Sequence, residues 1–175
     1  MTVNFQIPEI ETERLRLRLP RASDLAAHTA FRTSERSKGV GGPFDASASF
    51  DHLGAIIGQW QLRGYGRWMV ADRQTDEPLG IVGIFHPDDW PEAEIGWSLY
   101  EAAEGRGIAQ EAATATRDYA YNALGWTRIV SLIMEDNARS IRLAERMGCQ
   151  KDSAFTHPDL GTLDIWVHPA PEALQ

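Results

Sequence analysis

A short glycine-containing stretch near the middle of the chain has the residue types of an anion-binding turn. It reads Glu104-Gly105-Arg106-Gly107-Ile108-Ala109. Glycine lets the backbone approach a ligand closely, and the N–H groups of the first turn of a following helix have no partners within that helix. Residues 94–124 are therefore predicted to form a strand, a turn and a helix whose first N–H groups can bind an anion.

The surrounding sequence restricts the kind of anion. The turn lacks the Gly-Lys-Ser/Thr ending that places a lysine on a terminal phosphate, and it lacks the third glycine and the downstream acid of a dinucleotide fold. Nucleoside triphosphates and NAD are therefore poor candidates. A Gly-x-Gly pair alone is also typical of an ordinary strand-to-helix loop, so the interpretation depends on the flanking sequence.

The turn resembles the pyrophosphate-binding motif Arg/Gln-x-x-Gly-x-Gly/Ala of the GNAT superfamily of acetyl-CoA-dependent N-acetyltransferases. Gly107 and Ala109 fill its last two positions, but Glu104 stands where the family has Arg or Gln. An acid there is not expected to help, and the neighbouring Arg106 is expected to offset its charge. The resemblance implies that the backbone of the turn binds the pyrophosphate, through Gly105, Arg106, Gly107, Ile108 and Ala109.

Three further segments are similar to one branch of that superfamily, the RimJ and RimL acetyltransferases of ribosomal-protein N termini. They are residues 12–18, Thr-Glu-Arg-Leu-Arg-Leu-Arg, the pair Glu111-Ala112, and residues 136–148, which begin Asp-Asn-Ala-Arg-Ser. The resemblance implies an α/β (α+β) fold with one GNAT domain over residues 1–175. We expect a mixed central sheet of about seven strands, flanked by about four helices, in which parallel strands four and five splay apart.

The resemblance also implies acetyl-CoA as the co-substrate, with its pantetheine arm between the splayed strands. The arm is expected to pair with strand backbone near Ser98 and Leu99. An N–H group near Leu99 or Tyr100 is expected to stabilise the oxyanion. Asn137, at the start of the last helix, is assigned to the same cofactor site.

Acetyl transfer needs a base, because amines are mostly protonated at pH 7. Glu94, at the start of the strand beside the splay, is the first choice. Glu92 and Asp89 are neighbours that could act through water. The alternative interpretation of Glu94 is an exposed carboxylate at a strand edge.

The leaving thiolate is commonly protonated in this superfamily by a tyrosine seven residues after the asparagine, but Ala144 stands there. The ribosomal-protein branch has a serine three residues after the asparagine, and this chain has Ser140. Ser140 is therefore the candidate acid. Alternatively, Asn137 caps the helix and Ser140 satisfies an N–H group of its first turn; both roles can coexist.

Apolar periodicity predicts the elements that position these residues. The arginines of residues 14–18 are interpreted as a solvated strand face, and the alternative is a role in holding substrate or CoA. Phe50 is expected on the buried face of its helix. The loop over residues 41–44 is either a lid or a plain connector. The expected strands are 14–19, 67–71, 79–85, 93–100, 128–134, 149–156 and 162–168, and the expected helices are 23–36, 48–62, the helix after the glycine turn, and 138–147.

Composition excludes several classes of function. With 175 residues and a net charge of −8, the chain has the length of one domain and lacks the basic balance of a nucleic-acid-binding protein. An acidic surface favours encounter with a cationic amine. No apolar run has the length of a membrane span, and no export signal is visible. One cysteine, Cys149, fits a reducing cytoplasm, and the scattered histidines predict no metal site.

The acceptor is left open between a protein N terminus and a small-molecule amine. Trp90 is the tryptophan expected to touch an acceptor or a second subunit of a homodimer. A CoA-binding module with little catalysis is the alternative function, because Glu104 and Ala144 both depart from the broad family pattern.

Overall fold

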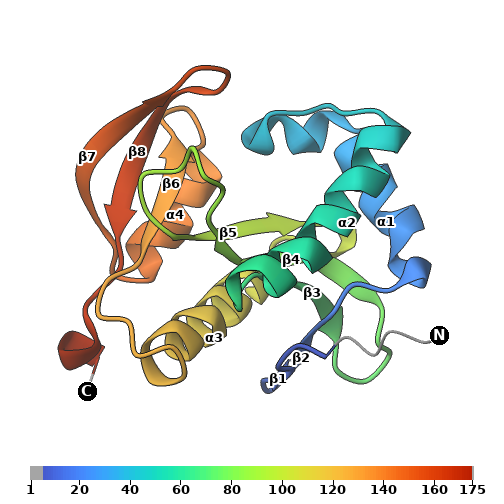
Figure 1. Ribbon diagram of the computed structural model, residues 1–175, viewed down its shortest axis with the longest axis horizontal. Coiled ribbons are helices and arrows are strands. Elements are labelled where there is room, and N and C mark those ends of the chain that lie inside the picture. The colour runs from blue at the N-terminus through green and yellow to red at the C-terminus, as the bar shows by residue number, and fades with distance from the viewer. Residues whose placement is uncertain (1–5, 175) are drawn as a thin grey trace.

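An eight-stranded mixed sheet forms the centre of the computed structural model, which describes residues 6–174 (Figure 1). The strands are β1 (Ile10–Glu11), β2 (Leu15–Arg18), β3 (Arg67–Asp72), β4 (Pro78–Phe85), β5 (Glu94–Leu99), β6 (Val130–Met134), β7 (Gln150–His157) and β8 (Gly161–Val167). The helices are α1 (Leu25–Arg32), α2 (Ala46–Arg63), α3 (Ile108–Asn122) and α4 (Ala138–Arg146), with 3₁₀ helices η1 (Ala22–Asp24), η2 (Glu35–Val40), η3 (Glu101–Ala103) and η4 (Pro171–Leu174). The α/β class and the mixed sheet are confirmed. The expected seven strands become eight because the two-residue β1 pairs with β2.

The sheet is almost divided in two between β5 and β6. The strand order is β1-β2-β3-β4-β5-β6-β8-β7, and β5–β6 is the parallel pair. These two strands share a single register position, Glu94 opposite Val130, whereas β4 and β5 pair at six positions. The splayed pair expected from the sequence is therefore present, as β5 and β6.

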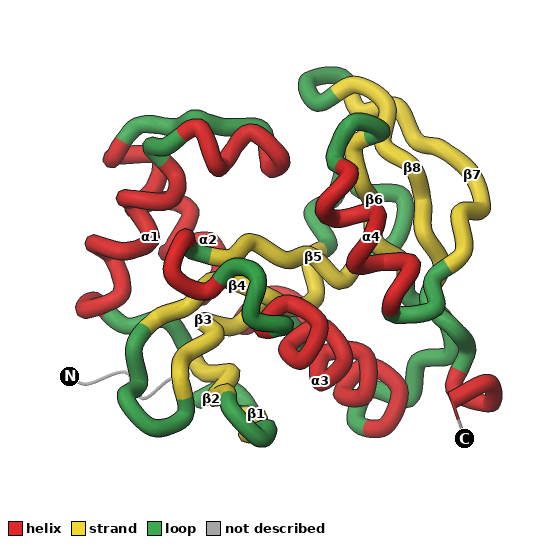
Figure 2. Tube along the Cα trace, turned by 180° about the vertical axis from the view of Figure 1, so that it is seen from behind, coloured by secondary structure: helices red, strands yellow, loops and turns green. Residues whose placement is uncertain are grey.

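Helices cover both faces of the sheet (Figure 2). Helices α1 and α2 pack together over β3, whereas α3 packs against β2, β4 and β5 on the other face and α4 against β6. Small side chains let α3 lie close to the sheet, since Ala112, Ala113 and Ala120 are fully buried in it. Beneath α1 and α2, a second apolar cluster comprises Phe31, Leu53, Ile56, Met69, Ile81 and Tyr100.

Two helices differ from the sequence prediction. The first helix ends at Arg32 rather than near Arg36, because Ser34 begins a new 3₁₀ turn by accepting a hydrogen bond from the Arg36 N–H. In α2, Phe50 is 63% exposed and so the prediction that it points inward is wrong. The neighbouring Ser49 occupies the buried face instead, in line with Leu53 and Ile56.

The interpretation of the arginines of residues 14–18 as a solvated face holds for Arg14, which is exposed, but is wrong for Arg18. Arg18 is 1% exposed and forms ion pairs with Asp24 at 2.8 Å and with Asp76 at 2.9 Å. Arg14 lies nearer the surface but pairs with Glu111 of α3 at 2.7 Å. Strand alternation alone could not show this, because the partner carboxylates come from other parts of the chain.

Candidate active site

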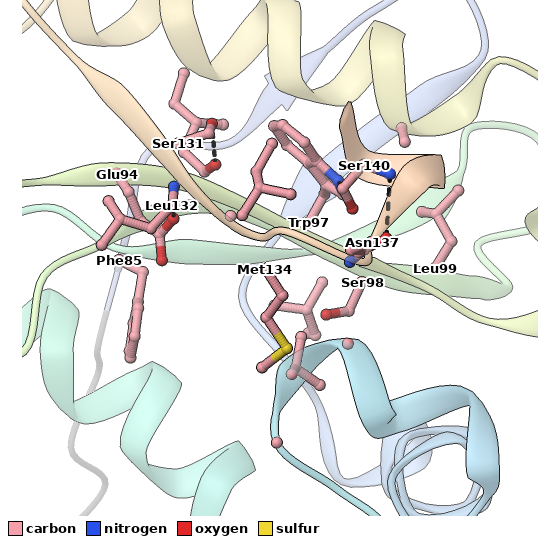
Figure 3. A pocket seen from close by; sticks show the side chains of 18 of the residues that line it. Phe85, Glu94, Trp97, Ser98, Leu99, Ser131, Leu132, Met134, Asn137 and Ser140 are labelled. Atoms are coloured by element: carbon pink, nitrogen blue, oxygen red, sulfur yellow. Dashed lines mark hydrogen bonds between the residues drawn. The ribbon is translucent and has the colours of Figure 1, made fainter. Parts of the chain in front are cut away.

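A cleft of about 1140 Å³ opens where β5 and β6 separate. Residues of α1, η2 and α2 form one wall, and the glycine turn with the first residues of α3 and α4 forms the other. Figure 3 shows Trp97 and Ser140 on the α3 side of β5, while Phe85 and Ser98 lie on the side of α1 and α2. The cleft therefore reaches both faces of the sheet through the gap between the two strands.

Where β5 and β6 separate, hydrogen bonds from side chains take the place of the backbone hydrogen bonds between the two strands. The Val130 N–H still faces the Ala93 carbonyl across the two strands, at 3.5 Å. Beyond it, the Leu132 N–H donates to the Glu94 carboxylate at 2.8 Å, and the Ser131 hydroxyl donates to the Ile95 carbonyl at 2.7 Å (Figure 3). The two side chains thus satisfy backbone groups that the separation would otherwise leave unpaired.

Glu94 is a buried carboxyl group rather than the exposed strand-edge carboxylate of the alternative interpretation. It is 7% exposed, lines the cleft, and accepts a second hydrogen bond from the indole N–H of Trp90 at 2.9 Å. Burial raises its pKa to about 7, although both hydrogen bonds and the charge of Arg67 act in the opposite direction. A group with this pKa can accept a proton near neutral pH.

The two neighbouring carboxylates lie differently. Glu92 accepts two hydrogen bonds from Arg128 on the surface and does not line the cleft. Asp89 lines the cleft but is paired with His157 at 3.0 Å. Trp90 also lines the cleft, and its contact with an acceptor or a second subunit stays a prediction. Of these carboxylates, Glu94 is the one buried at the separation.

The backbone of β5 offers alternate residues to the cleft. The Tyr100 N–H donates to the Leu79 carbonyl at 2.9 Å, so it is not available as the oxyanion donor. Antiparallel pairing alternates, so Ser98 also directs its backbone groups to β4, and Trp97 and Leu99 direct theirs to the gap. The expected donor narrows to the Leu99 N–H, while Ser98 faces the cleft with its side chain (Figure 3). The phenol ring of Tyr100 packs away from it, against Phe31.

The glycine turn places the N-terminus of α3 at the cleft, and no described side chain caps this end of the helix. Gly105 and Gly107 have φ angles of 70° and 75°, which favour glycine. No side chain caps the helix, and its first backbone bond runs from the Glu111 N–H to the Gly107 carbonyl. Ile108, Ala109 and Gln110 line the cleft, and their N–H groups have no helical acceptor. This arrangement can bind an anion.

Two segments that the sequence singled out separately meet at this turn. The guanidinium of Arg14 donates to the Arg106 carbonyl at 2.8 Å and to the carboxylate of Glu111 at 2.7 Å. The Arg14 N–H also donates to Glu111, at 2.9 Å. Arg14, the residue that precedes strand β2, therefore holds the turn and the start of α3 in place.

The expectation that Arg106 offsets the charge of Glu104 is wrong. Arg106 donates to the Ala102 carbonyl and does not line the cleft. Glu104 is instead paired with Arg36 of η2 and Arg139 of α4, and these pairs lower its pKa despite the opposing effect of burial. The acid thus links the two walls of the cleft and neutralises two cations beside the turn.

The start of α4 positions a hydroxyl group in the cleft. The Asn137 side chain accepts from the Ser140 N–H at 3.2 Å, so the predicted helix cap is present. The indole N–H of Trp97 donates to the Ser140 Oγ at 3.1 Å. Because that oxygen already accepts a hydrogen bond, the hydroxyl hydrogen is free to point toward another acceptor.

The wall made by α1, α2 and β3 holds basic residues that the sequence analysis missed. Arg32, Arg67, His28 and His52 all line the cleft. Isolated residues of these types on amphipathic elements resemble a solvated face, so no local signal indicated them. They meet only because three separate elements pack together.

Comparison with known proteins fits this geometry. A family model described as an acetyltransferase (GNAT) domain matches residues 14–150. The chain belongs to the GNAT acetyltransferase family. Among relatives, this GNAT protein is 31% identical to the uncharacterized N-acetyltransferase YoaA of Bacillus subtilis over 153 residues, which are 85% of this chain and 86% of YoaA. It is 38% identical to YkkB of the same organism, over a segment of 90 residues, which are 49% of this chain and 52% of YkkB.

Solved structures show the same fold. An acetyltransferase from Agrobacterium tumefaciens is 37% identical, with a TM-score of 0.86 over 97% of this chain and 98% of that one. RimL, a ribosomal L7/L12 α-N-protein acetyltransferase solved with coenzyme A, is 18% identical, with a TM-score of 0.75 over 92% of this chain and 97% of RimL. At that identity the likeness to RimL concerns the fold alone.

Two absences hold for residues 6–174. No helix in this range has both the length and the apolarity that a membrane crossing requires. No group of three or more His, Cys, Asp or Glu side chains in the same range could hold a metal ion.

Proposed function

We propose that this GNAT protein transfers the acetyl group of acetyl-CoA directly to a primary amine, with Glu94 as the general base. The observation that carries the proposal is the position of Glu94: a buried carboxyl group at the separation of β5 and β6, with a pKa of about 7. The acceptor is the amine of a protein N terminus or of a small molecule.

The residues present fit coenzyme A. The free N–H groups of residues 108–110 would bind the pyrophosphate, and Arg146, which lines the cleft, adds positive charge on the same side. The backbone groups of Trp97 and Leu99 that face the gap would pair with the amides of the pantetheine arm. The gap between β5 and β6 provides the passage for that arm.

The chemistry then follows from the side chains around the gap. Glu94 removes a proton from the amine, whose nitrogen attacks the thioester carbonyl carbon as the C–S bond breaks. The Leu99 N–H stabilises the oxyanion, and the thiolate leaves toward the Ser140 hydroxyl. Since Trp97 already donates to the Ser140 Oγ, that hydroxyl donates rather than accepts at the sulfur.

The test is the rate of Glu94→Gln with acetyl-CoA and a panel of amines. Loss of the base is expected to lower kcat/KM by roughly 10²- to 10⁴-fold, and the wild-type rate should rise with pH through about 7 as the Glu94 carboxyl ionises. The control Glu92→Gln, on the surface, should keep both the rate and the pH profile. A Glu94→Gln variant with the wild-type rate would remove Glu94 from the mechanism.

Binding separates the enzyme from the alternative function. Tight calorimetric binding of acetyl-CoA without transfer to any amine of the panel would indicate a CoA-binding module. The absence of binding at reachable concentrations would contradict both functions.

A further inference from the structure

We infer that the amine acceptor carries a carboxylate, and that Arg32 and Arg67 bind this carboxylate on the cleft wall beside Glu94. The inference rests on the proposed function and names the substrate class of the same site. It depends on two arginine side chains that line the cleft and form no ion pair with a carboxylate among residues 6–174.

Arg67 has only one hydrogen bond for a guanidinium with five donors. Its Nη1 donates to His52 Nε2 at 3.2 Å, and its buried Nε has no partner in the described part of the chain. The ring of Phe85 lies 4.2 Å from the guanidinium carbon. Burial lowers the pKa of Arg67 to about 10, which shows that the charge is costly to keep here.

Arg32 is satisfied even less. The residue is 7% exposed, and within residues 6–174 its side chain makes neither a hydrogen bond nor an ion pair. Its guanidinium carbon lies 3.7 Å from the centre of the Phe44 ring. Burial lowers its pKa as well. A ring face attracts a cation, but it leaves the N–H groups in the guanidinium plane without acceptors.

A chain of hydrogen bonds holds Arg67 in its orientation. Because arginine can only donate, His52 must accept at Nε2 and carry its hydrogen on Nδ1. His52 Nδ1 then donates to His28 Nε2 at 3.0 Å, and His28 Nδ1 donates to the Tyr100 hydroxyl at 3.0 Å. Burial, followed by the nearby arginine charges, lowers the pKa of His28 to about 4 and of His52 to about 2. Both histidines are therefore neutral and supply no negative charge.

Arg67 faces the same part of the cleft as the proposed base, and Arg32 is near enough for its charge to lower the pKa of Arg67. Arg67 is opposite Gly83 in β4, which is opposite Gly96 in β5, two residues from Glu94. Gly96 has no side chain to fill this row, and a Cβ built there would meet only the Glu94 carboxylate, at 4.0 Å. Arg67 therefore lies across an open row from Glu94. An acceptor amine at Glu94 places its carboxylate toward Arg67 and Arg32.

A carboxylate suits these donors better than a neutral group. Two guanidinium groups offer parallel N–H donors that match the two oxygens of a carboxylate. The Glu94 charge raises the pKa of Arg67 but makes no hydrogen bond to it. A bound anion would supply the acceptors that the two guanidinium groups lack in the free protein. The anion proposed to bind at the glycine turn cannot be this counter-ion, because it would lie at the start of α3 and not beside Arg32 and Arg67.

The first experiment is a calorimetric titration of the CoA-saturated protein with a panel of amino acids and their carboxamides. At least one amino acid is expected to bind about tenfold or more tightly than its carboxamide, as for a charge-assisted hydrogen bond. A second arm uses amidated tetrapeptides that begin with Asp or Asn, and it distinguishes an α-carboxylate from an acidic side chain. Equal affinity within every pair of both arms would overturn the inference.

Variants then assign the preference to the arginines. Arg32→Met is the main variant, because the Arg32 side chain donates to no described residue and its removal leaves no acceptor unpaired. Its affinity ratio of acid to amide should fall to about one, while its midpoint of thermal unfolding stays at or above the wild-type value. Arg67→Lys should reduce the ratio with less effect on folding. A lower midpoint and an unchanged ratio for Arg32→Met would show that the residue is structural.

The control is Arg128→Met, which removes an arginine paired with Glu92 on the surface. It should keep the wild-type ratio. Thiol release from acetyl-CoA is measured separately with the same compounds. Transfer to amines without preference for the carboxylate would contradict the inference alone, whereas carboxylate binding without any transfer would contradict the proposed function alone.

Discussion

Buried charges occur in two regions of this molecule, and the two regions treat them in opposite ways. At the junction of β2 with α1, Arg18 is paired with two carboxylates, Asp24 and Asp76. In the cleft, Arg32 and Glu94 are buried and Arg67 is half-buried, and none of them has a counter-ion in hydrogen-bonding contact among the described residues. The charges of the first region are paired within the free protein, and those of the second region are not.

The contrast indicates where stability and function are separated. A paired buried ion belongs to the folded structure, because removing one partner leaves the other uncompensated. An unpaired ion in a cleft lowers stability, and a protein retains it where it serves a site. The same residue type, arginine, therefore supports the fold in one place and faces a ligand in the other.

The largest effect is expected at the paired site. Arg18→Met leaves Asp24, itself 1% exposed, as a buried carboxylate without its main partner. Loss of one partner of a buried pair costs about 3–5 kcal/mol. Urea unfolding at pH 7 measures the free energy of unfolding, with Arg16→Met, at a half-buried position of the same strand, as the control. An Arg18→Met variant as stable as Arg32→Met would abolish the distinction between the regions.

The next effect concerns Glu94 and has a definite sign. Its folded pKa of about 7 lies above the ordinary value of 4.5, so the folded state binds more protons between these two pH values. The stabilisation from the protonated form is fully present below pH 4.5 and is lost as the pH rises through about 7. The loss amounts to roughly 3 kcal/mol.

Glu94→Gln cannot show this titration. The free energy of unfolding of wild type minus that of the variant should therefore fall over this pH range, as measured by urea unfolding at several pH values. Glu92→Gln should leave the wild-type pH dependence intact. A constant difference between wild type and Glu94→Gln would mean that the carboxyl is not perturbed.

A smaller effect is expected from placing a negative charge at the start of α3, where the pyrophosphate of coenzyme A is proposed to bind. Ala109→Glu suits the N-terminal turn of a helix, so folding should be preserved. The added carboxylate would repel the pyrophosphate and is expected to weaken acetyl-CoA binding about tenfold, or about 1.4 kcal/mol by calorimetry. Thr114→Glu, in the same helix but outside the cleft lining, is the matched control. Equal weakening by both variants would place the pyrophosphate elsewhere.

The smallest effect is expected at Ser140. Ser140→Ala keeps the helix cap, since Asn137 accepts from the backbone N–H, and it removes one hydrogen bond to the leaving thiolate. A fall in kcat of about 3- to 10-fold corresponds to a hydrogen bond of about 1 kcal/mol. Steady-state kinetics should show little change in KM. A drop of a thousandfold would make Ser140 an essential acid instead.

The part of the cleft formed by β5, the glycine turn and the start of α3 could largely be predicted from the sequence. The glycines of the turn, the strand before it and the alanine-rich helix after it are local patterns, and local geometry largely determines whether such a turn can bind an anion. The resemblance added the separation of β5 and β6. The resemblance could not predict that the Glu94 and Ser131 side chains bond to backbone groups across the gap. Those contacts depend on the register of two strands that are distant in the sequence.

The basic residues on the wall made by α1, α2 and β3 could not be predicted from the sequence, for a physical reason. His28, His52 and Arg67 come from three elements and acquire their roles only by contact. Nothing in the periodicity of α1 or α2 distinguishes a buried histidine from an exposed one. Arg18 shows the same difficulty in the scaffold, because its partners follow from the packing of α1 and of the loop before β4.

The single shared register position of β5 and β6 has a consequence for solvent exchange. Along β5, Gly96 and Ser98 hydrogen-bond to β4, while Trp97 and Leu99 face the gap. In the free protein the amide hydrogens of one strand should therefore exchange with D₂O in an alternating order, slow at Gly96 and Ser98 and fast at Trp97 and Leu99. A ligand whose amides bridge the gap would slow exchange at Trp97 and Leu99 alone. The unchanged rates at Gly96 and Ser98 would then serve as the internal reference for cofactor binding.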